Sequence, residues 1–233
     1  MATLACAACG VLLDIESDPP VSPVEGGATS DAAPGEGGGG GDTSVPDAVA
    51  DGPAPDAGDA GDASPGCRGA VDCERLVFVT NTLFGANEVV DGDKKCTDEA
   101  NVASAAPEIK GRTFVAWYSL TLKTAADRHV HGTKPYRLIG GQKVADNWTR
   151  LVSGTLDAAI NITSSKAVLP GDVRVWTGTA ADGGARFSRC NDWQSIDPGV
   201  SGVIGSTGFA TSAWSDNGVA GCDEVLRLYC IEE

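Results

Sequence analysis

The sequence predicts an α+β domain, built mainly of short antiparallel strands with one or two helices and long loops, and stapled by disulfide bonds. Three observations predict this class. An acidic leader precedes a part of nearly balanced charge. That second part alternates short β-branched apolar runs with loops rich in Gly, Ser and Asp, without a regular succession of strand and helix. It also holds six cysteines with no CxxC pair among them.

The charge distribution divides the chain into a tail and one domain. Residues 1–66 contain twelve acidic residues and no Lys or Arg, whereas residues 67–233 contain twenty acidic and seventeen basic residues. Residues 10–66 are rich in Gly, Pro and Ala and poor in large apolar side chains, so we expect a disordered acidic linker. Such a tail is repelled by nucleic acid and by anionic membranes, so neither is an expected partner. Residues 67–233 are the expected globular domain.

The first ten residues, "MATLACAACG", resemble the end of a bacterial lipoprotein signal. Cys9 follows two alanines and precedes Gly10, and we favour Cys9 over Cys6 as the lipidated residue. No basic residue precedes it, and eight residues are too few for a complete signal, so residues 1–9 are expected to be a truncated remnant. The alternative is that both cysteines are incidental. No other stretch is apolar over the ~20 residues that span a bilayer, so a lipid anchor is the only expected membrane contact.

Most of the expected elements are short strands. Residues 75–82 and 112–120 are apolar and β-branched, as is typical of strands. Residues 136–139 and 142–144 flank two glycines and predict a hairpin. Residues 147–154 predict a short helical turn with a glycine stop. Further short strands are expected at residues 173–179, 185–190 and 225–231.

One longer helix is expected at residues 91–106. Asp91 or Asp93 would stand near its start, and Pro107 lies beyond its end. The buried face of this helix would carry Cys96, Ala100 and Ala103.

The cysteines favour disulfides over a metal site. Zinc sites usually combine short C-x2–4-C steps with histidines, and this chain has only two histidines. An even number of well-separated cysteines instead indicates a disulfide framework formed in an oxidising compartment. Cys67 and Cys73 are close enough in sequence to close a small local loop.

Five motifs occur in a fixed order along residues 76–233: "AWYS", "NWTRLVSG", "VWTGTAADGG", "CNDW" and "LYCIEE". In this order they resemble the endostatin-like domain, including related domains in secreted proteins and lipoproteins of Gram-negative bacteria such as myxobacteria. The stretch "GANEVVDGD" departs from the Gly-rich sequence that the resemblance implies ahead of the first bridging cysteine, here Cys96. The leader has no Gly-X-Y period, so it does not resemble a collagen helix.

The resemblance implies a C-type-lectin-like fold with two nested disulfides, Cys96–Cys230 and Cys190–Cys222. It also implies a place at the bacterial cell envelope, either lipid-anchored at the outer membrane or in the periplasm, or outside the cell. The family's heparin-binding, arginine-rich surface is not expected here, because residues 67–233 have a net charge of only −3. Heparin-like polyanions are therefore not expected as partners.

We expect no enzyme and no cofactor. The chain lacks the G-x-S-x-G motif of a nucleophilic serine, and its cysteines are better used as bridges. It also lacks the E-P-N or Q-P-D and W-N-D triplets of calcium-dependent lectins. Two alternatives stay open: a secreted hydrolase-like enzyme with an unrecognised site, and a metal-dependent binding domain that uses His129 and His131, which would point to one side of an extended segment.

The densest signal is the stretch "VRVWTGTAADGGARFSRCNDW" at residues 173–193. Val173, Val175 and Trp176 are expected in the core, and "TAADGGA" is typical of a turn. Trp193 is expected to pack beside a bridged Cys190. The exposed remainder is a candidate ligand-binding rim made of Asp182, Arg186, Asn191 and Asp192. The working hypothesis is a non-catalytic binding or structural module for an unknown protein or glycan.

Overall fold

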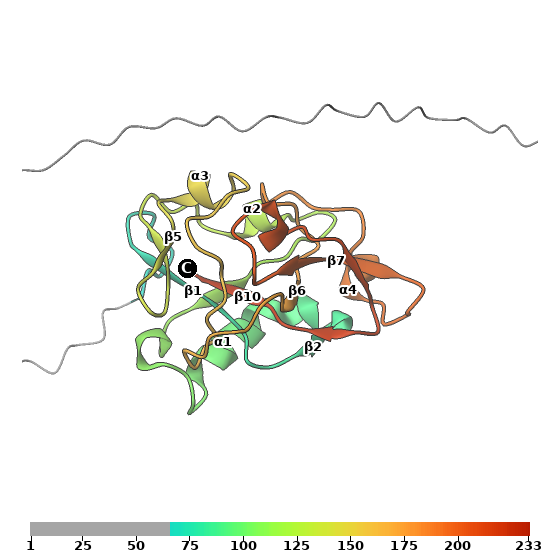
Figure 1. Ribbon diagram of the computed structural model, residues 1–233, viewed down its shortest axis with the longest axis horizontal. Coiled ribbons are helices and arrows are strands. Elements are labelled where there is room, and N and C mark those ends of the chain that lie inside the picture. The colour runs from blue at the N-terminus through green and yellow to red at the C-terminus, as the bar shows by residue number, and fades with distance from the viewer. Residues whose placement is uncertain (1–65) are drawn as a thin grey trace, which may run out of the picture. The chain divides into compact units, whose positions relative to one another are not determined.

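The computed structural model describes residues 66–233 (Figure 1). They form an α+β structure with many short strands, few helices and three disulfides. Cys6, Cys9 and nearly all of the expected linker lie outside the described residues. None of the helices in residues 66–233 is long and apolar enough to cross a membrane.

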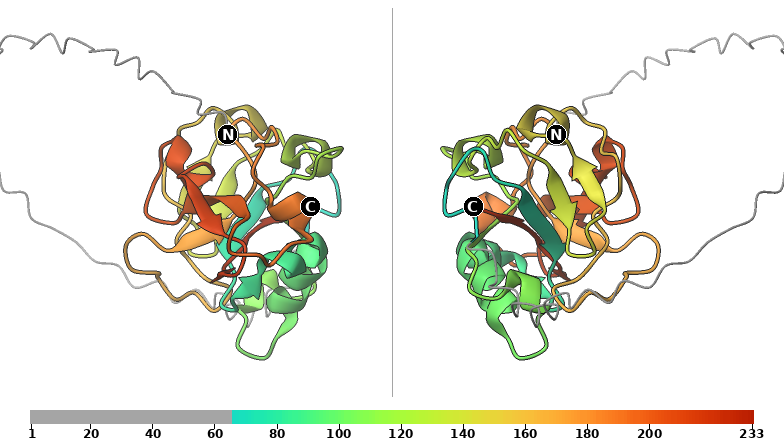
Figure 2. Two further views of the ribbon diagram at one scale, coloured as in Figure 1. Left: turned by 90° about the vertical axis from the view of Figure 1, so that its right-hand side faces the viewer. Right: turned by 90° about the vertical axis from the view of Figure 1, so that its left-hand side faces the viewer.

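The largest element is a five-stranded sheet of order β3-β10-β1-β4-β5. Its strands are β1 (Arg75–Val79), β3 (Phe114–Ala116), β4 (Tyr136–Leu138), β5 (Lys143–Ala145) and β10 (Tyr229–Glu232). All neighbours are antiparallel except β1 and β4, which are parallel. The first strand therefore pairs with the last at the middle of the sheet, as Figure 2 shows for the teal β1 beside the dark red β10.

Strand β1 is buried on both faces, because its side chains alternate between two hydrophobic clusters. Phe78 belongs to one cluster, where its ring meets Phe114 edge-on at 4.9 Å between centroids. Val77 and Val79 point to the other cluster, which also contains Trp117. The run of apolar residues that predicted this strand is thus the signature of a strand with no solvent-facing side.

The long helix α1 (Gly92–Asn101) covers one face of the sheet, where Cys96 bonds to Cys230 of β10. Gly92 permits its close approach to β3, since a Cβ there would lie 2.8 Å from the Cβ of Ala116. A 3₁₀ helix, η1 (Ala86–Asp91), precedes it.

The helix ends earlier than the predicted range, at Asn101, and Ala103 is exposed, so the expectation of a buried Ala103 is wrong. Asn101 accepts a hydrogen bond from the Gly111 backbone N–H, and Val102 is extended. This early end lets Ala106 reach the core and donate its N–H to Ser164.

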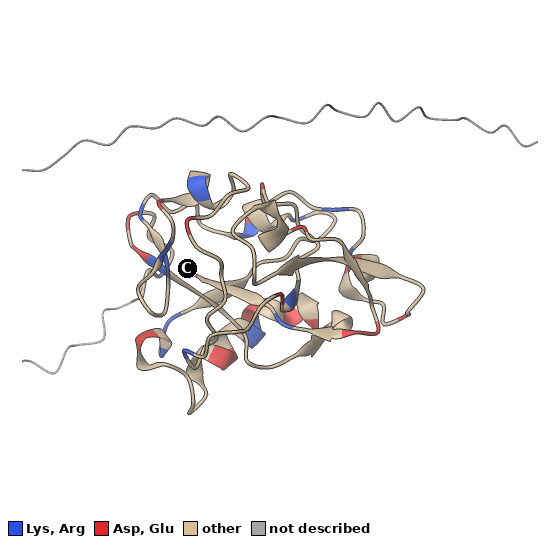
Figure 3. Ribbon diagram, viewed as in Figure 1, with Lys and Arg blue, Asp and Glu red and all other residues tan. Residues whose placement is uncertain are grey.

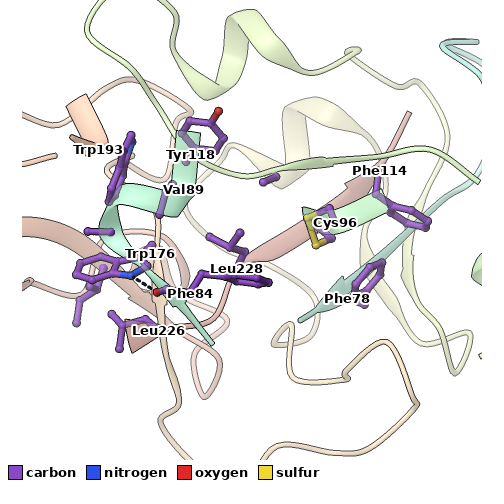
Figure 4. Packing of buried hydrophobic residues seen from close by; sticks show 14 of the residues in the cluster. Phe78, Phe84, Val89, Cys96, Phe114, Tyr118, Trp176, Trp193, Leu226 and Leu228 are labelled. Carbon is purple, nitrogen blue, oxygen red and sulfur yellow. Dashed lines mark hydrogen bonds between the residues drawn. A yellow bond between two sulfur atoms is a disulfide. The ribbon is translucent and has the colours of Figure 1, made fainter. Parts of the chain in front are cut away.

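A second region contains a three-stranded antiparallel sheet of order β6-β7-β8 and a short β2–β9 pair. The strands are β2 (Phe84–Gly85), β6 (Arg174–Trp176), β7 (Ser201–Ser206), β8 (Val219–Gly221) and β9 (Val225–Leu226). The packing of Trp176, Phe84 and Leu226 between these strands is shown in Figure 4, where the Trp176 indole N–H donates to the Phe84 carbonyl.

Two predicted strands differ from the structure. Residues 185–190 form only isolated bridges, at Ala185 and Arg189, because the segment leaves the sheet to enter a left-handed turn. Residues 225–231 are divided between β9 and β10, since Leu226 pairs with Phe84 whereas Tyr229 pairs with Val79 of the large sheet.

The predicted hairpin is confirmed as β4 and β5, with Gly141 at a φ of 87° in the turn. The predicted helical turn is α3 (Trp148–Leu151). The side chain of Asn147 caps it by accepting from the Arg150 N–H at 3.0 Å. Gly154 follows with a φ of 83°. The remaining short helices are η2 (Pro107–Ile109), α2 (Ala125–Arg128), α4 (Cys190–Trp193) and η3 (Ser212–Trp214).

All six described cysteines form disulfides: Cys67–Cys73, Cys96–Cys230 and Cys190–Cys222. The two longer bridges have the nested pairing that the family resemblance implies. Such bridges are typical of proteins that fold in an oxidising compartment.

Candidate functional site

The segment α4 is a left-handed turn. Cys190, Asn191, Asp192 and Trp193 have φ angles of 50°, 52°, 55° and 62°. For L-amino acids this conformation costs about 1–2 kcal/mol per residue, and consecutive residues rarely adopt it. Backbone strain of this kind persists only where the surrounding structure enforces it, and it often accompanies functional sites.

A disulfide at one end and a buried side chain at the other hold the turn in place. Cys190 is bonded to Cys222. Trp193 has an exposed fraction of 0%, and its indole N–H donates to the Ser119 carbonyl at 2.9 Å. Its ring meets that of Trp176 edge-on, with 5.7 Å between centroids (Figure 4). Burial of a tryptophan contributes on the order of 3 kcal/mol or more, which offsets a large part of the backbone strain.

Two glycines make room for the turn. A Cβ on Gly178, which has a φ of 58°, would lie 2.7 Å from the Trp193 ring. A Cβ on Gly202 would lie 2.9 Å from the sulfur of Cys190. Gly178 therefore allows the segment after β6, and Gly202 allows β7, to approach the turn more closely than any other residue would.

The turn forms one wall of a cavity of about 470 Å³, which we call the α4 cavity. Its lining combines an aromatic ring, an aliphatic side chain and hydrogen-bonding groups: Thr121, Phe187, Ser188, Arg189, Asn191, Asp192, Val200 and Ser201. Phe187 has an exposed fraction of 99%. Within residues 66–233, no hydrogen bond involves the carboxamide of Asn191, so its donors and acceptor are available to a ligand.

Arg189 and Asp192 form an ion pair in the cavity wall, at 3.2 Å from Nε to Oδ1. The same carboxylate oxygen accepts the Thr121 N–H at 2.8 Å, and Arg189 Nη2 donates to the Thr121 hydroxyl at 2.8 Å. Burial opposes ionisation of Asp192, but the hydrogen bonds from Thr121 and Arg189 outweigh it and lower the pKa of the carboxyl. Both members of the ion pair are thus charged, and their net charge is zero.

The other two predicted rim residues lie elsewhere. Asp182 and Arg186 line a second cavity of about 280 Å³, with Asp216 among its other residues. Arg186 Nε donates to Asp216 Oδ2 at 2.7 Å, and Asp182 accepts the Gly184 N–H in its own turn. The structure therefore divides the predicted rim between two cavities.

The two histidines do not converge on a common ligand. His129 is buried, and its Nδ1 lies 2.7 Å from Glu233 Oε1. His131 Nε2 lies 2.9 Å from the Ala126 carbonyl oxygen, and its ring stacks on Trp148 at 4.2 Å. In the part of the chain that the structure describes, no group of three or more His, Cys, Asp or Glu side chains is arranged to hold a metal ion.

A nucleophile–base pair would need a hydroxyl or thiol bonded to an imidazole. Among residues 66–233, the imidazole contacts are to Glu233 and to a backbone carbonyl, and the cysteines are bridged. Of the two cavities described above, the α4 cavity is the larger and is the candidate site considered below.

Sequence reasoning missed Phe187 and Thr121 as site residues. Phe187 falls in the segment that was predicted to be a strand, and an aromatic residue in a strand is usually buried. Thr121 lies far from the turn in sequence, and only the fold brings it to Asp192. The flanking Arg186 and Ser188 were the one signal available that Phe187 lies at the surface.

Acidic and basic residues are interspersed along the described chain, as the red and blue ribbon segments of Figure 3 show. Many are paired with each other, for example Arg174 with Glu224 and Arg137 with Glu74.

A scan against protein-family models found no match for this chain, and a search of curated proteins found no significant relative.

Proposed function

We propose that this chain is a non-catalytic binding module whose globular part is an endostatin-like domain with C-type-lectin-like topology. Three features support the assignment: the order of the sequence motifs, the pairing of the first and last strands β1 and β10, and the nested disulfides that tie α1 to β10 and α4 to the loop after β8. These features concern the fold only. The ligand has to be inferred from the α4 cavity.

The observation that carries the binding function is the α4 cavity. A left-handed turn of four non-glycine residues is costly, yet a disulfide, a buried tryptophan and two close glycines all maintain it. The result is that Asn191 and Asp192 stand at an open cavity beside an exposed phenylalanine. Preformed concave sites with a few fixed polar groups are typical of ligand binding.

We further propose that the module is displayed at the bacterial cell envelope or secreted. Support comes from the lipoprotein-like sequence at Cys9, the acidic leader and the disulfides. Cys9 lies outside the described residues. Mass spectrometry of the native protein is expected to find an acylated Cys9 at the mature N-terminus, and an unmodified upstream residue would contradict the anchor.

The ligand of the proposed module is a protein or a glycan. A screen of the full chain against glycans and envelope proteins is expected to find saturable binding. Phe187→Ala should weaken it about tenfold or more, because this substitution removes the aromatic ring of the cavity lining. Val168→Ala, at an exposed position that is not part of the cavity lining, is the matched control. Turnover of a substrate without saturable binding would contradict this proposal and favour the hydrolase-like alternative.

A further inference from the structure

The α4 cavity carries no uncompensated charge in its lining. Arg189 and Asp192 neutralise each other, and the other polar lining groups are three hydroxyls and one carboxamide. A strongly charged ligand would gain little from such a wall, because the attraction from one member of the ion pair is cancelled by the other. The lining therefore favours a ligand that is polar and neutral.

The polar groups keep unused hydrogen-bonding capacity. Within the described chain, the Asn191 carboxamide and Arg189 Nη1 make no hydrogen bond. The Asp192 carboxylate accepts from Thr121 and Arg189, and a carboxylate has about four acceptor sites, so it can accept further bonds. Planar amide, carboxylate and guanidinium groups each bind adjacent donors and acceptors in pairs. Two hydroxyl groups on adjacent carbons of a ring present an adjacent donor and acceptor of this kind.

The ring of Phe187 adds an apolar face at the same cavity, and its exposed fraction of 99% leaves it free to be covered. Among common biological molecules, a saccharide combines a neutral ring of vicinal hydroxyls with an apolar face of C–H groups. The volume of about 470 Å³ also lies in the usual range for small-ligand sites.

We propose that the ligand of the α4 cavity is a neutral saccharide, bound without a metal ion by stacking on Phe187 and by hydrogen bonds to Asn191 and Asp192. This inference rests on the proposed binding function and names its ligand class. A protein partner is less well suited, since the core of a protein interface is a contiguous apolar patch. In the lining of this cavity the apolar side chains are Phe187 and Val200, and the other six residues are polar.

The test is an array of neutral oligosaccharides probed with the full chain, followed by titration of each bound sugar. We expect at least one sugar to bind equally well with and without EDTA. Phe187→Ala and Asn191→Gly should each weaken binding about tenfold or more, which corresponds to about 1.4 kcal/mol. Asn191→Gly removes the carboxamide at a position where glycine accepts the backbone conformation, so loss of binding cannot be ascribed to unfolding. Val168→Ala should bind like the wild type.

Four other results would overturn the inference. If no neutral sugar binds but a protein does, in a manner sensitive to Phe187→Ala, the saccharide is wrong and the binding function stands. If neither binds, both proposals fail. Sugar binding that EDTA abolishes contradicts the metal-free site, and sugar binding that both variants retain places it elsewhere.

Discussion

The four residues of the left-handed turn differ in how well they tolerate left-handed backbone angles. Asn191 and Asp192 occupy the two central positions, and Asn and Asp are the non-glycine residues that tolerate left-handed angles best. Cys190 and Trp193 tolerate them poorly, but one is held by a disulfide and the other by full burial. The turn is thus favoured by residue type at its two central positions and enforced by tertiary contacts at its two ends.

The first prediction concerns Asn191 and the backbone strain. Asn191→Gly should leave the free energy of unfolding within about 1 kcal/mol of the wild type, because glycine adopts a φ of 52° without steric cost. Asn191→Val should lower it by about 1–3 kcal/mol, since a β-branched side chain clashes in this region. Urea unfolding of the purified variants measures both.

Asn87→Val is the matched control, at an exposed position whose φ is not positive. Its effect should stay within about 0.5 kcal/mol. If Asn191→Gly and Asn191→Val lower the free energy of unfolding equally, the backbone of the turn is not strained as described.

At the scale of elements, disulfides join segments that the hydrogen bonds of the sheets do not join. The bridge Cys96–Cys230 ties helix α1 to strand β10 across 134 residues of sequence. The bridge Cys190–Cys222 spans 32 residues and ties α4 to the loop after β8. The bridge Cys67–Cys73 spans only six residues and closes a local loop before β1. In the chain-entropy model, the bridge that closes the longer loop stabilises more.

The second prediction compares two double variants. Removal of the α4 bridge by Cys190→Ala and Cys222→Ala should lower the free energy of unfolding by about 4 kcal/mol, against about 2 kcal/mol for Cys67→Ala with Cys73→Ala. The first variant should also lose ligand binding, because the turn loses one of its two attachments. Urea unfolding and a binding titration measure these effects. Retained binding in the first variant would show that the Trp193 contacts alone hold the turn.

At the scale of the whole molecule, ionised carboxylates stabilise several separate segments, most of them short helices. Their pKa values are lowered in the folded state: Glu88, Glu108, Asp127, Asp157 and Asp192. For Glu88, hydrogen bonds from Lys95 and from the Gly85 backbone lower the pKa. A lowered folded-state pKa contributes stability that is present above the unfolded value, about 4, and is lost as the pH falls through the folded value.

The third prediction follows from this loss of stability at low pH. The melting temperature should be nearly constant from about pH 7 to pH 5 and should fall below about pH 4, as these carboxylates become protonated. The difference in melting temperature between the wild type and Asp192→Asn should shrink over the same interval, because protonated Asp192 no longer forms an ion pair with Arg189. Differential scanning calorimetry at a series of pH values measures both. A constant difference down to about pH 2 would contradict the role given to Asp192.

Local sequence predicted the elements whose formation depends on neighbouring residues. The apolar run before Thr80 became β1, and the glycine pair at Gly140 became the turn between β4 and β5. Asn147 and Gly154 bound the helical turn α3, because a cap and a glycine stop act through hydrogen bonds within a few residues.

Elements that depend on distant partners were not predictable from local patterns. The end of α1 at Asn101 depends on contacts with Gly111, and the division of residues 225–231 depends on Phe84 and Val79. The two-residue strands β2 and β9 carry no periodic signal, since a strand this short is defined only by its partner.

By itself, the sequence determined the α+β class, the disulfide-bonded character of residues 67–233 and the separation of an acidic leader from a charge-balanced part. Only the tertiary structure decided that "CNDW" is left-handed, that Phe187 is exposed and that Thr121 meets Asp192. The reason is physical. Composition and periodicity reflect interactions between near neighbours, whereas this turn exists because a bridge to Cys222 and the burial of Trp193 hold it against its own backbone preference.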